Sequence, residues 1–555
     1  MPGLVLHSNC KITFQLTTVR DKNLQYEEGA FMTTHVCYDI KGIQSFIFRI
    51  PKLKYIIGGS AIIDRFDREF AISLNNKDTI CLFAGGGRGA FEVKDEVTAK
   101  ELQQKIITEA HRFGLDVRFG VNKNYSEAAQ QGNDLHPYLP KHSEMEGHPC
   151  NVSGLYPVSA GKGKGVGGAN HATIERRIFD RGDKMSRHFE DRLLDGLDLG
   201  LELKPEDVCF LSNVDNEDES GRAGAAALGN RNRWAVIAMD GNDMGSQFRH
   251  KDTTSDLKSW IKPMSAALDS CSFRAAQSGI EKVVGQWMLD PRHVEMRSLR
   301  DDGKRVLPIR PLVVGGDDLI VLCHSQYAFD FVQAAMQVFE NESIACADEY
   351  RRTNAGSELW PATSGRVTIS AGILFASTKL PLHLALPYTE LLLASAKGRG
   401  RELAKTGDPS PACLDWEQAT ETLLDMPTDR RNRELRFMDQ DIGQEINLTC
   451  RPYSIEDFTE LRKWALSKKG LQGLPKSIVH SLRDGLSAGY WDRQIFAARN
   501  AKNWKLIEEV LAEEEKMHKV PVGSRWKLDK ECRRTDLLDA VLIHEECSRM
   551  EGATV

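Results

Sequence analysis

Two stretches that lie far apart in the chain follow the same pattern, and this repeat limits the folds that the chain can adopt. Residues 36–42 (VCYDIKG) and 237–243 (IAMDGND) each read as an apolar strand that ends in an aspartate and a turn with glycine. Residues 81–93 (CLFAGGGRGAFEV) and 311–323 (PLVVGGDDLIVLC) each read as a hairpin with a glycine-rich turn. The repeat predicts two copies of one domain in a single chain.

Strand-like and helix-like runs alternate around both copies, which is typical of α/β patterning. After the second hairpin, a helical run at 327–352 is followed by the strand-like residues 366–376 (RVTISAGILFA). Together with the strand before it and the hairpin itself, this order is the one that a palm-type βαββαβ domain requires. We therefore expect an α/β (α+β) chain built on two palm-like domains.

The chain has 555 residues, which allows about three or four domains of ordinary size. Its composition changes along the sequence and divides it into five predicted regions. They are an N-terminal segment (1–32), a degenerate palm-like domain (33–121), an irregular and partly helical insert (122–228), a palm domain with the Gly-Gly-Asp-Asp hairpin (229–405) and a C-terminal helical domain (406–555).

Composition and charge exclude several classes of protein. With 41% hydrophobic and 27% charged residues, the chain is similar to ordinary globular proteins rather than to disordered ones. Its net charge of -6 provides no overall basic field for nucleic acid, so any such contact must be local. No apolar run is long enough to span a membrane and the start lacks the pattern of a signal peptide, so we expect a cytoplasmic protein without a membrane partner.

The second hairpin carries two adjacent carboxylates at its tip. Gly315, Gly316, Asp317 and Asp318 lie between two apolar arms, and the glycines let a phosphate approach the backbone. Adjacent like charges at a turn are unfavourable unless a cation neutralises them. Carboxylate oxygens suit Mg²⁺ or Mn²⁺, so a divalent metal is the expected partner. The alternative is a solvated hairpin turn, because Asp and Gly are common in turns.

A third carboxylate is needed to hold two ions, and Asp240 is the candidate because it ends the apolar strand just before a glycine turn. The predicted catalytic and metal-binding residues are therefore Asp240, Asp317 and Asp318. Two ions held in this way suit nucleotidyl transfer, since one activates an attacking hydroxyl and the other neutralises the leaving pyrophosphate. Asp243 is either a supporting ligand or a helix N-cap. Lys397 is suited to contact a triphosphate, and a solvated lysine at a helix end is the alternative.

Two groups of motifs carry a resemblance to a known family. The first comprises residues 39–47 (DIKGIQSFI) and 51–60 (PKLKYIIGGS). The second comprises Asp240, the turn from Gly315 to Asp318, Ser370-Ala371-Gly372 and Ala396-Lys397. These motifs resemble, in that order, the first and second palms of the large polymerase-cyclase subunit of type III CRISPR effector complexes and its stand-alone relatives. The resemblance covers residues 33–121 and 234–404.

The resemblance implies a pair of ferredoxin-like palms, the second of which converts ATP into cyclic oligoadenylate, a second messenger of antiviral defence. By the same resemblance, Asp240, Asp317 and Asp318 would bind two Mg²⁺ or Mn²⁺ ions. The residues that would hold the nucleotide are Gly241, Gly315, Gly316, Ser370 and Lys397.

Asp39 would be a counterpart of Asp240 without a metal role. The reason is that Gly87 and Arg88 stand in the first copy where Asp317 and Asp318 stand in the second. The first palm is therefore expected to lack a metal site.

The sequence departs from that family at two points. Many members begin with a histidine-aspartate nuclease domain, but this chain contains no His-Asp dipeptide, so DNA cleavage is not predicted. Members commonly carry a zinc ribbon between the palms, but the 12 cysteines include no C-x-x-C pair and Cys150 stands alone in that region. A partial zinc site of His148, Cys150 and His171 is the alternative to ordinary loop residues.

Three functions are consistent with these residues. The first is an enzyme that joins ATP into a cyclic oligoadenylate. The second is a large scaffold subunit of an RNA-guided effector complex, active only when assembled with guide RNA and other subunits. In that case basic stretches such as 430–433 (RRNR) would bind RNA or partners, although such a run is usually a solvated helix face. The third is a cyclic-dinucleotide synthase that uses ATP or GTP, with the other palm as its facing half.

Overall fold

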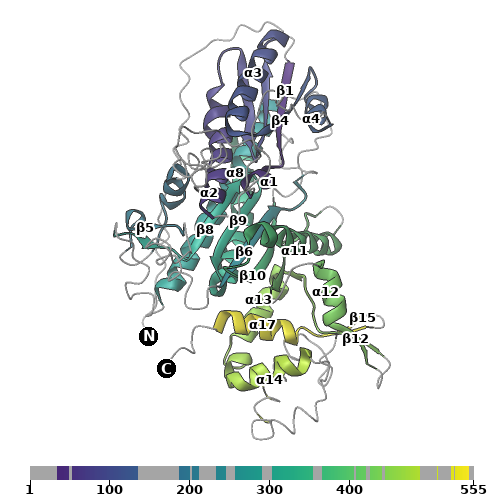
Figure 1. The fold of residues 1–555 in the computed structure, drawn as a ribbon. Helices are drawn as coiled ribbons and strands as arrows, with labels where there is room; N and C mark the ends of the chain where they lie inside the picture. Colours follow the sequence, from purple (N-terminus) through teal and green to yellow (C-terminus); the bar gives the residue numbers. More distant parts are fainter. Residues whose placement is uncertain are drawn as a thin grey trace, which may run out of the picture.

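The chain is described by a computed structural model (Figure 1). The residues that it describes are 34–48, 53–134, 187–199, 203–211, 233–244, 257–289, 303–353, 366–405, 408–419, 425–439, 444–487, 505, 509, 527–529 and 532–548. The predicted N-terminal segment and the residues of the predicted partial zinc site, His148, Cys150 and His171, lie outside them.

The first palm is a four-stranded antiparallel sheet with helices packed on it. Its strands are β1 (Thr34–Lys41), β2 (Thr79–Gly85), β3 (Arg88–Val93) and β4 (Asp116–Asn122). Its helices are α1 (Ile43–Ile47), α2 (Leu53–Arg65), the π-helix η1 (Phe66–Ala71), α3 (Glu96–Phe113) and α4 (Tyr125–Asp134). α3 begins where the Asp95 carboxylate accepts a hydrogen bond from the Thr98 amide, and ends at Gly114 with a φ of 70°.

The second palm repeats this arrangement in a larger sheet. Its core strands are β6 (Arg233–Gly241), β8 (Ile309–Gly315), β9 (Asp318–His324) and β10 (Ile369–Ser377). Its helices are α8 (Leu257–Met288), α10 (Ala328–Thr353) and α11 (Leu382–Leu403). The strand order is β2-β3-β1-β4 in the first palm and β8-β9-β6-β10 in the second, so the first strand of each copy is central in both. The prediction of two ferredoxin-like α+β palms is confirmed.

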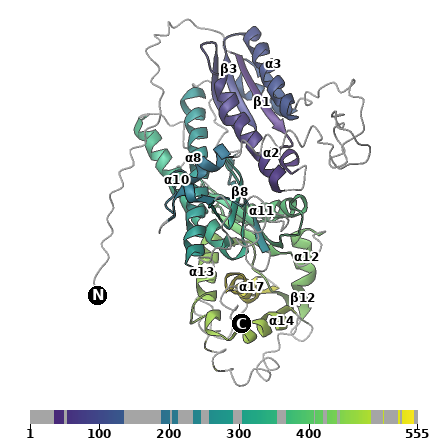
Figure 2. The same cartoon turned by 60° about the vertical axis from the view of Figure 1, so that its left-hand side comes forward.

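The two faces of the second sheet are covered by different parts of the chain. Ala235, Ile237 and Met239 point to one face and join a core with residues of α8 and α10. Trp234 and Val236 alternate with them and join a core with the first palm and α11. Figure 1 shows the first palm at the upper end of the molecule, and Figure 2 shows the same stacking from another side. Side chains in register with Trp234 and Val236 therefore face the first palm.

The region after residue 405 contains strands as well as helices. β11 (Cys413–Gln418) pairs in parallel with β10, and β14 (Tyr453–Ser454) extends the same sheet. A separate small sheet is formed by β12 (Arg436–Asp439), β13 (Gln444–Asn447), β15 (Lys527–Asp529) and β16 (Cys532–Arg534). The helices are α12 (Pro427–Glu434), α13 (Ile455–Ala465), the 3-10 helix η4 (Leu471–Gly473), α14 (Lys476–Ser487) and α17 (Leu537–Ser548).

This region therefore differs from the helical domain that the sequence predicts. In β11, Asp415 and Glu417 alternate with apolar residues but are buried, whereas alternation predicts a solvated acidic face.

The predicted insert is described only in part. A helix covers 187–194, and the 3-10 helix η2 (Pro205–Asp207) precedes β5 (Val208–Cys209). β5 pairs in parallel with β7 (Arg305–Val306), and the 3-10 helix η3 (Ser325–Tyr327) joins β9 to α10. Within the described part of the chain, no helix is both long and apolar enough to cross a lipid bilayer.

Candidate active site

Three carboxylates meet at the ends of two neighbouring strands of the second palm. Asp240, near the end of β6, lies directly opposite Asp318, the first residue of β9. Asp317 precedes Asp318 in the turn of the β8-β9 hairpin. One carboxylate oxygen from each residue lies within 4.8 Å of those from the other two. The structure thus brings together the three side chains that the sequence predicts as metal ligands.

The glycine turn holds the two adjacent acids in this position. Gly315 pairs with Asp318 across the hairpin, so Gly316 and Asp317 form a two-residue turn. Gly316 has a φ of 61°, a conformation that glycine adopts without strain. The hydroxyl of Ser272, on α8, donates a hydrogen bond of 2.6 Å to the Gly316 carbonyl and fixes the turn to that helix. Sequence reasoning missed Ser272, because a serine in the middle of a helix carries no local signal.

Two predicted nucleotide-binding glycines make room for the cluster in different ways. A Cβ atom at Gly241 would lie 2.9 Å from the Cβ of Asp317 and 2.8 Å from the Sδ of Met244, so a side chain there would displace Asp317. A Cβ atom at Gly315 would have its nearest neighbour, Nη2 of Arg68, 4.0 Å away. Open space over the turn is what a phosphate-binding loop requires. Contacts of these glycines with a nucleotide stay a prediction.

Lys397 reaches the cluster because α11 packs directly on β10. A Cβ atom at Gly372 would lie 2.3 Å from the Thr389 carbonyl oxygen and 2.5 Å from the Leu393 nitrogen, so only glycine permits this approach. The Nζ of Lys397 then donates hydrogen bonds to the Asp240 carboxylate and, at 2.8 Å, to the Gly241 carbonyl. In this structure the ammonium neutralises Asp240, and its contact with a triphosphate stays a prediction.

Ser370 lies opposite Asp240 in the ladder between β6 and β10. Its side chain is fully buried, and its hydroxyl accepts a hydrogen bond of 3.2 Å from the Cys413 amide. Asn242 is also buried and donates to the Thr368 hydroxyl at 2.8 Å. These contacts join the end of β6 to neighbouring segments of the sheet. The predicted role of Ser370 in nucleotide binding stays untested.

The carboxylate of Asp243 lies outside the cluster of three. It accepts a hydrogen bond of 3.0 Å from the Ser410 amide, and the residue has a φ of 57°. Met244 is helical, but residues 245–256 lie outside the described part of the chain, so the helix N-cap stays a prediction. The contact with Ser410 indicates a role in holding the loop after α11 next to the end of β6.

The electrostatics of the cluster favour a bound cation. Burial and the neighbouring charge of Asp240 raise the pKa of Asp317 to about 7. Desolvation beside the other acids, followed by the charges of Asp317 and Asp240, raises the pKa of Asp318 well above its ordinary value although the residue is exposed, and Lys397 offsets only part of this. Hard oxygen ligands at this spacing fit Mg²⁺ or Mn²⁺. The three carboxylates therefore fit a divalent metal ion, and the binding of two ions stays a prediction.

A cavity of about 570 Å³ lies between the palms and contains the cluster. From the second palm it is lined by the glycine turn and all three carboxylates, and from the first palm by residues that include Asp39, Lys41 and Arg88. Its volume is within the range of small-molecule sites. Because Asp240 and Asp318 are in register with side chains that face the first palm, the acids open into this shared cavity.

The matching corner of the first palm is closed by cations. Arg88 lies opposite Asp39 in the ladder between β1 and β3, where Asp318 lies opposite Asp240 in the second palm. The Asp39 carboxylate forms ion pairs with Lys41 and, at 3.5 Å, with Arg88. The hairpin turn keeps its glycines but carries no acid. That Asp39 has no metal role stays a prediction.

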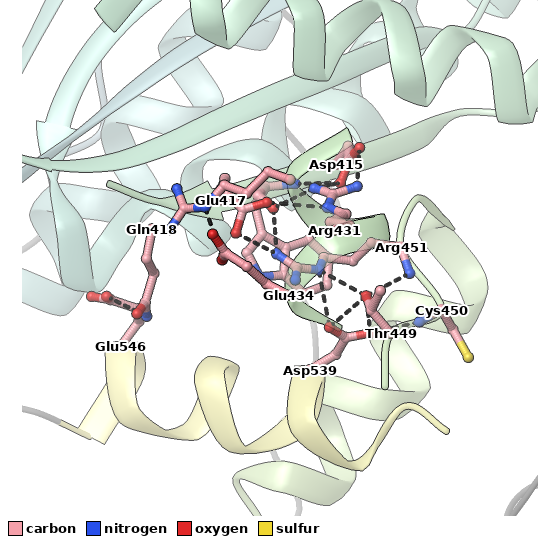
Figure 3. A network of polar contacts seen from close by, with 12 residues as sticks. Asp415, Glu417, Gln418, Arg431, Glu434, Thr449, Cys450, Arg451, Asp539 and Glu546 are labelled. Atoms are coloured by element: carbon pink, nitrogen blue, oxygen red, sulfur yellow. Dashed lines mark hydrogen bonds and ion pairs between the residues drawn. The ribbon is translucent and has the colours of Figure 1, made fainter. Parts of the chain in front are cut away.

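The basic run from Arg430 to Arg433 is divided between surface and interior. Arg431 is buried and forms a two-pronged ion pair with Asp415, at 2.9 and 2.8 Å, and a further one with Glu417 at 3.1 Å (Figure 3). Arg433 is exposed and pairs with Asp425 at 2.7 Å. Arg431 therefore forms ion pairs in the protein interior and is not available to RNA or a partner. This limits the binding role that the sequence predicts for residues 430–433.

Arg451 extends the buried network to the C-terminal helix. It donates to the Trp416 carbonyl at 2.6 Å, and its Nε lies 3.0 Å from the carboxylate of Asp539 on α17 (Figure 3). The hydroxyls of Thr449 and Tyr453 also donate to Asp539. The network thus joins β11, α12 and α17 and fixes the C-terminal helices to the sheet of the second palm.

Comparison with known families identifies the segment that carries the cluster. The family model described as Cas10/Cmr2, second palm domain, matches residues 233–404. These residues are similar to a second palm of the Cas10/Cmr2 type. The family resemblance that the motifs indicate is confirmed for this segment. No sequence match to a curated protein was found.

Similar solved structures include three of Csm1, all distant in sequence. The Csm1-Csm4 cassette in complex with cA4 is 14% identical, with a TM-score of 0.46 over 92% of this chain and 70% of that chain. The apo cassette is 15% identical, with a TM-score of 0.44 over 93% and 71%. Csm1 in T.onnurineus is 14% identical, with a TM-score of 0.44 over 93% and 69%. The assignment of the second palm is carried by the family model.

Proposed function

We propose that this chain is a nucleotidyltransferase that joins ATP into a cyclic oligoadenylate in a CRISPR type III-like antiviral defence. The observation that carries the proposal is the convergence of Asp240, Asp317 and Asp318 at a cavity large enough for nucleotides. The match of residues 233–404 to the Cas10/Cmr2 second palm supports it. The preference for ATP comes from the family resemblance, because no base-reading side chain is identified in the sequence.

The residues of the site have distinct roles in this proposal. Two divalent ions bound to the three carboxylates would supply activation of a ribose hydroxyl and neutralisation of the departing pyrophosphate. Asp317 and Asp318 would give up their protons on binding cations, because the charge of the cations offsets the burial and the neighbouring carboxylates that raise their pKa values. The turn at Gly315 and Gly316 leaves space for the phosphates, and Lys397 holds Asp240 in place and offers its charge to the triphosphate.

The experiment is incubation of the purified chain with ATP and Mg²⁺ or Mn²⁺, followed by mass spectrometry of the product. We expect pyrophosphate and a cyclic oligoadenylate. The double variant Asp317→Asn/Asp318→Asn should abolish turnover and Mn²⁺ binding but remain folded, since the two carboxylates repel each other without metal. Asp348→Asn, which changes an exposed carboxylate on α10, is the matched control and should keep both properties. Undiminished turnover in the double variant would contradict the proposal.

The alternatives are separated by the same assay. A chain that is silent alone but active after addition of guide RNA and effector subunits is the scaffold-type subunit. A product that is a cyclic dinucleotide, or that forms from GTP, identifies the cyclic-dinucleotide synthase. Absence of activity with RNA and partners present would end all three assignments.

A further inference from the structure

Arg68 brings a cation of the first palm to the glycine turn of the second. It lies in the π-helix η1, a rare element that often occurs at functional sites. Its side chain lines the cavity between the palms and is one-quarter exposed. Its Nη2 lies 4.0 Å from the position of a Cβ atom added at Gly315. The guanidinium therefore stands over the turn that leaves room for phosphates.

Two aspartates hold the guanidinium in this position. Asp269, on α8, accepts hydrogen bonds from Nη1 and Nη2, and Asp64, on α2, accepts one of 2.9 Å from Nε. A guanidinium has five N–H donors, so these contacts leave one N–H on each Nη, and its two-pronged edge becomes available to a phosphate only when the contact with Asp269 is released. Asp64 also pairs with Arg192 at 2.9 Å and keeps that cation when Arg68 binds another anion.

The charge in the cavity makes the position of Arg68 important. Among the described residues, seven aspartates and three basic side chains line the cavity. The other two basic side chains, Lys41 and Arg88, pair with Asp39 at the corner of the first palm. A triphosphate that enters this acidic space needs cations beside its own oxygens. Of the lining residues, Arg68 supplies such a cation next to Gly315.

We infer that Arg68 binds the triphosphate of the nucleotide held on the second palm, in exchange for part of its contact with Asp269. The planar fork of a guanidinium matches two phosphate oxygens, which an ammonium does not. The inference rests on the proposed function, because the carboxylate cluster places the phosphates over the turn. It gives the first palm, which has lost its acids, a direct part in nucleotide binding.

Isothermal titration calorimetry tests this with the full chain, Mg²⁺ and α,β-methylene ATP, an analogue whose α-phosphate cannot be transferred. Arg68→Ala should weaken binding by about 10- to 100-fold, the usual range for charge-assisted hydrogen bonds. Arg68→Lys should retain part of the affinity, because it keeps the charge but not the fork. Arg65→Ala removes a surface arginine that pairs with Glu69 on the same helical segment, and should bind like the wild type.

Asp269→Asn separates phosphate binding from a purely structural link between the palms. If Arg68 binds phosphate, this variant keeps or increases the affinity, because an amide competes less for the guanidinium. If the ion pair between Arg68 and Asp269 only holds the palms together, Asp269→Asn and Arg68→Ala weaken binding equally. That result overturns the inference. Unchanged affinity in Arg68→Ala also overturns it while the proposed function stands. A wild-type chain that does not bind the analogue overturns both.

Discussion

At the scale of single residues, the sequence predicts those functional side chains whose role is indicated by their neighbours in the sequence. Asp317 and Asp318 stand next to each other at a glycine turn, and Asp240 ends an apolar strand, so all three are visible without a structure. Arg68 and Asp269 are not, because they meet only through the packing of one palm on the other. A buried titratable residue is equally hidden, since burial is a property of the fold.

Asp67 is such a residue, and it predicts how stability depends on pH. Its buried carboxylate accepts hydrogen bonds from the Gly87 amide at 2.7 Å and the Tyr38 hydroxyl at 3.2 Å, but burial outweighs them and raises its pKa to about 7. The unfolded value is about 3.9. The folded state therefore binds the Asp67 proton more tightly than the unfolded state does, and this proton stabilises the fold. The stabilisation is complete below about pH 4 and is lost as pH rises to about 7.

In wild type, this proton linkage lowers the free energy of unfolding by up to ~4 kcal/mol between about pH 4 and about pH 7. Asp67→Asn should remove that pH dependence. The measurement is urea unfolding of wild type and variant at several pH values. Asp95→Asn is the control with the opposite sign, because hydrogen bonds from Thr98 lower the pKa of Asp95 and its contribution is lost in acid. A difference between Asp67→Asn and wild type that does not vary with pH would refute the assignment.

At the scale of elements, periodicity predicts the palm strands but misses β11. Seven core strands of the palms lie at apolar runs that the sequence predicts as strands, whereas β4 is not predicted. In β11, Asp415 and Glu417 are buried and paired with Arg431, which no pattern of alternation indicates. Long-range ion pairs decide the burial of such a strand, so local sequence cannot.

The contact between α11 and β10 depends on Gly372. The control for a substitution there is Gly398, a second glycine, which lies on α11. Gly372→Ala places a methyl group against the backbone of the helix and should destabilise the fold by about 1–3 kcal/mol. Gly398→Ala has nothing within 4 Å of the new atom and should stabilise by up to ~1 kcal/mol, since alanine favours the helix. Chemical denaturation of both variants checks this, and equal effects would show that the close approach is unimportant.

At the scale of the whole molecule, the second palm is the centre to which both other parts are fixed. Its sheet packs against the first palm through one core, and its other core includes residues of α13, α14 and α17. Figure 2 shows the three parts in sequence along the molecule. The predicted boundary at residue 405 falls between two paired strands, β10 and β11. A change in composition marks a boundary along the sequence, but strands on its two sides can still pair in one sheet.

The buried ion pairs that join these parts predict a large effect on stability. Arg431→Met leaves Asp415 and Glu417 buried with less compensation, which should cost about 3–5 kcal/mol of unfolding free energy. Arg433→Met removes an exposed cation of the same helix and should change stability by less than about 1 kcal/mol. Guanidinium unfolding curves for the two variants provide the comparison. Similar small losses in both would mean that the buried network contributes little.

The matching hairpins of the two palms have a consequence for how such a chain can evolve. Residues 87 and 88 in one copy, and 317 and 318 in the other, occupy equivalent tips whose backbone pairing is the same. An acid at residue 87 would be strained, because Gly87 has a φ of 74° and a Cβ atom there would lie 2.0 Å from Cδ1 of Ile43. The first palm is left to form the opposite wall of the shared cavity, on which new contacts to a ligand can arise.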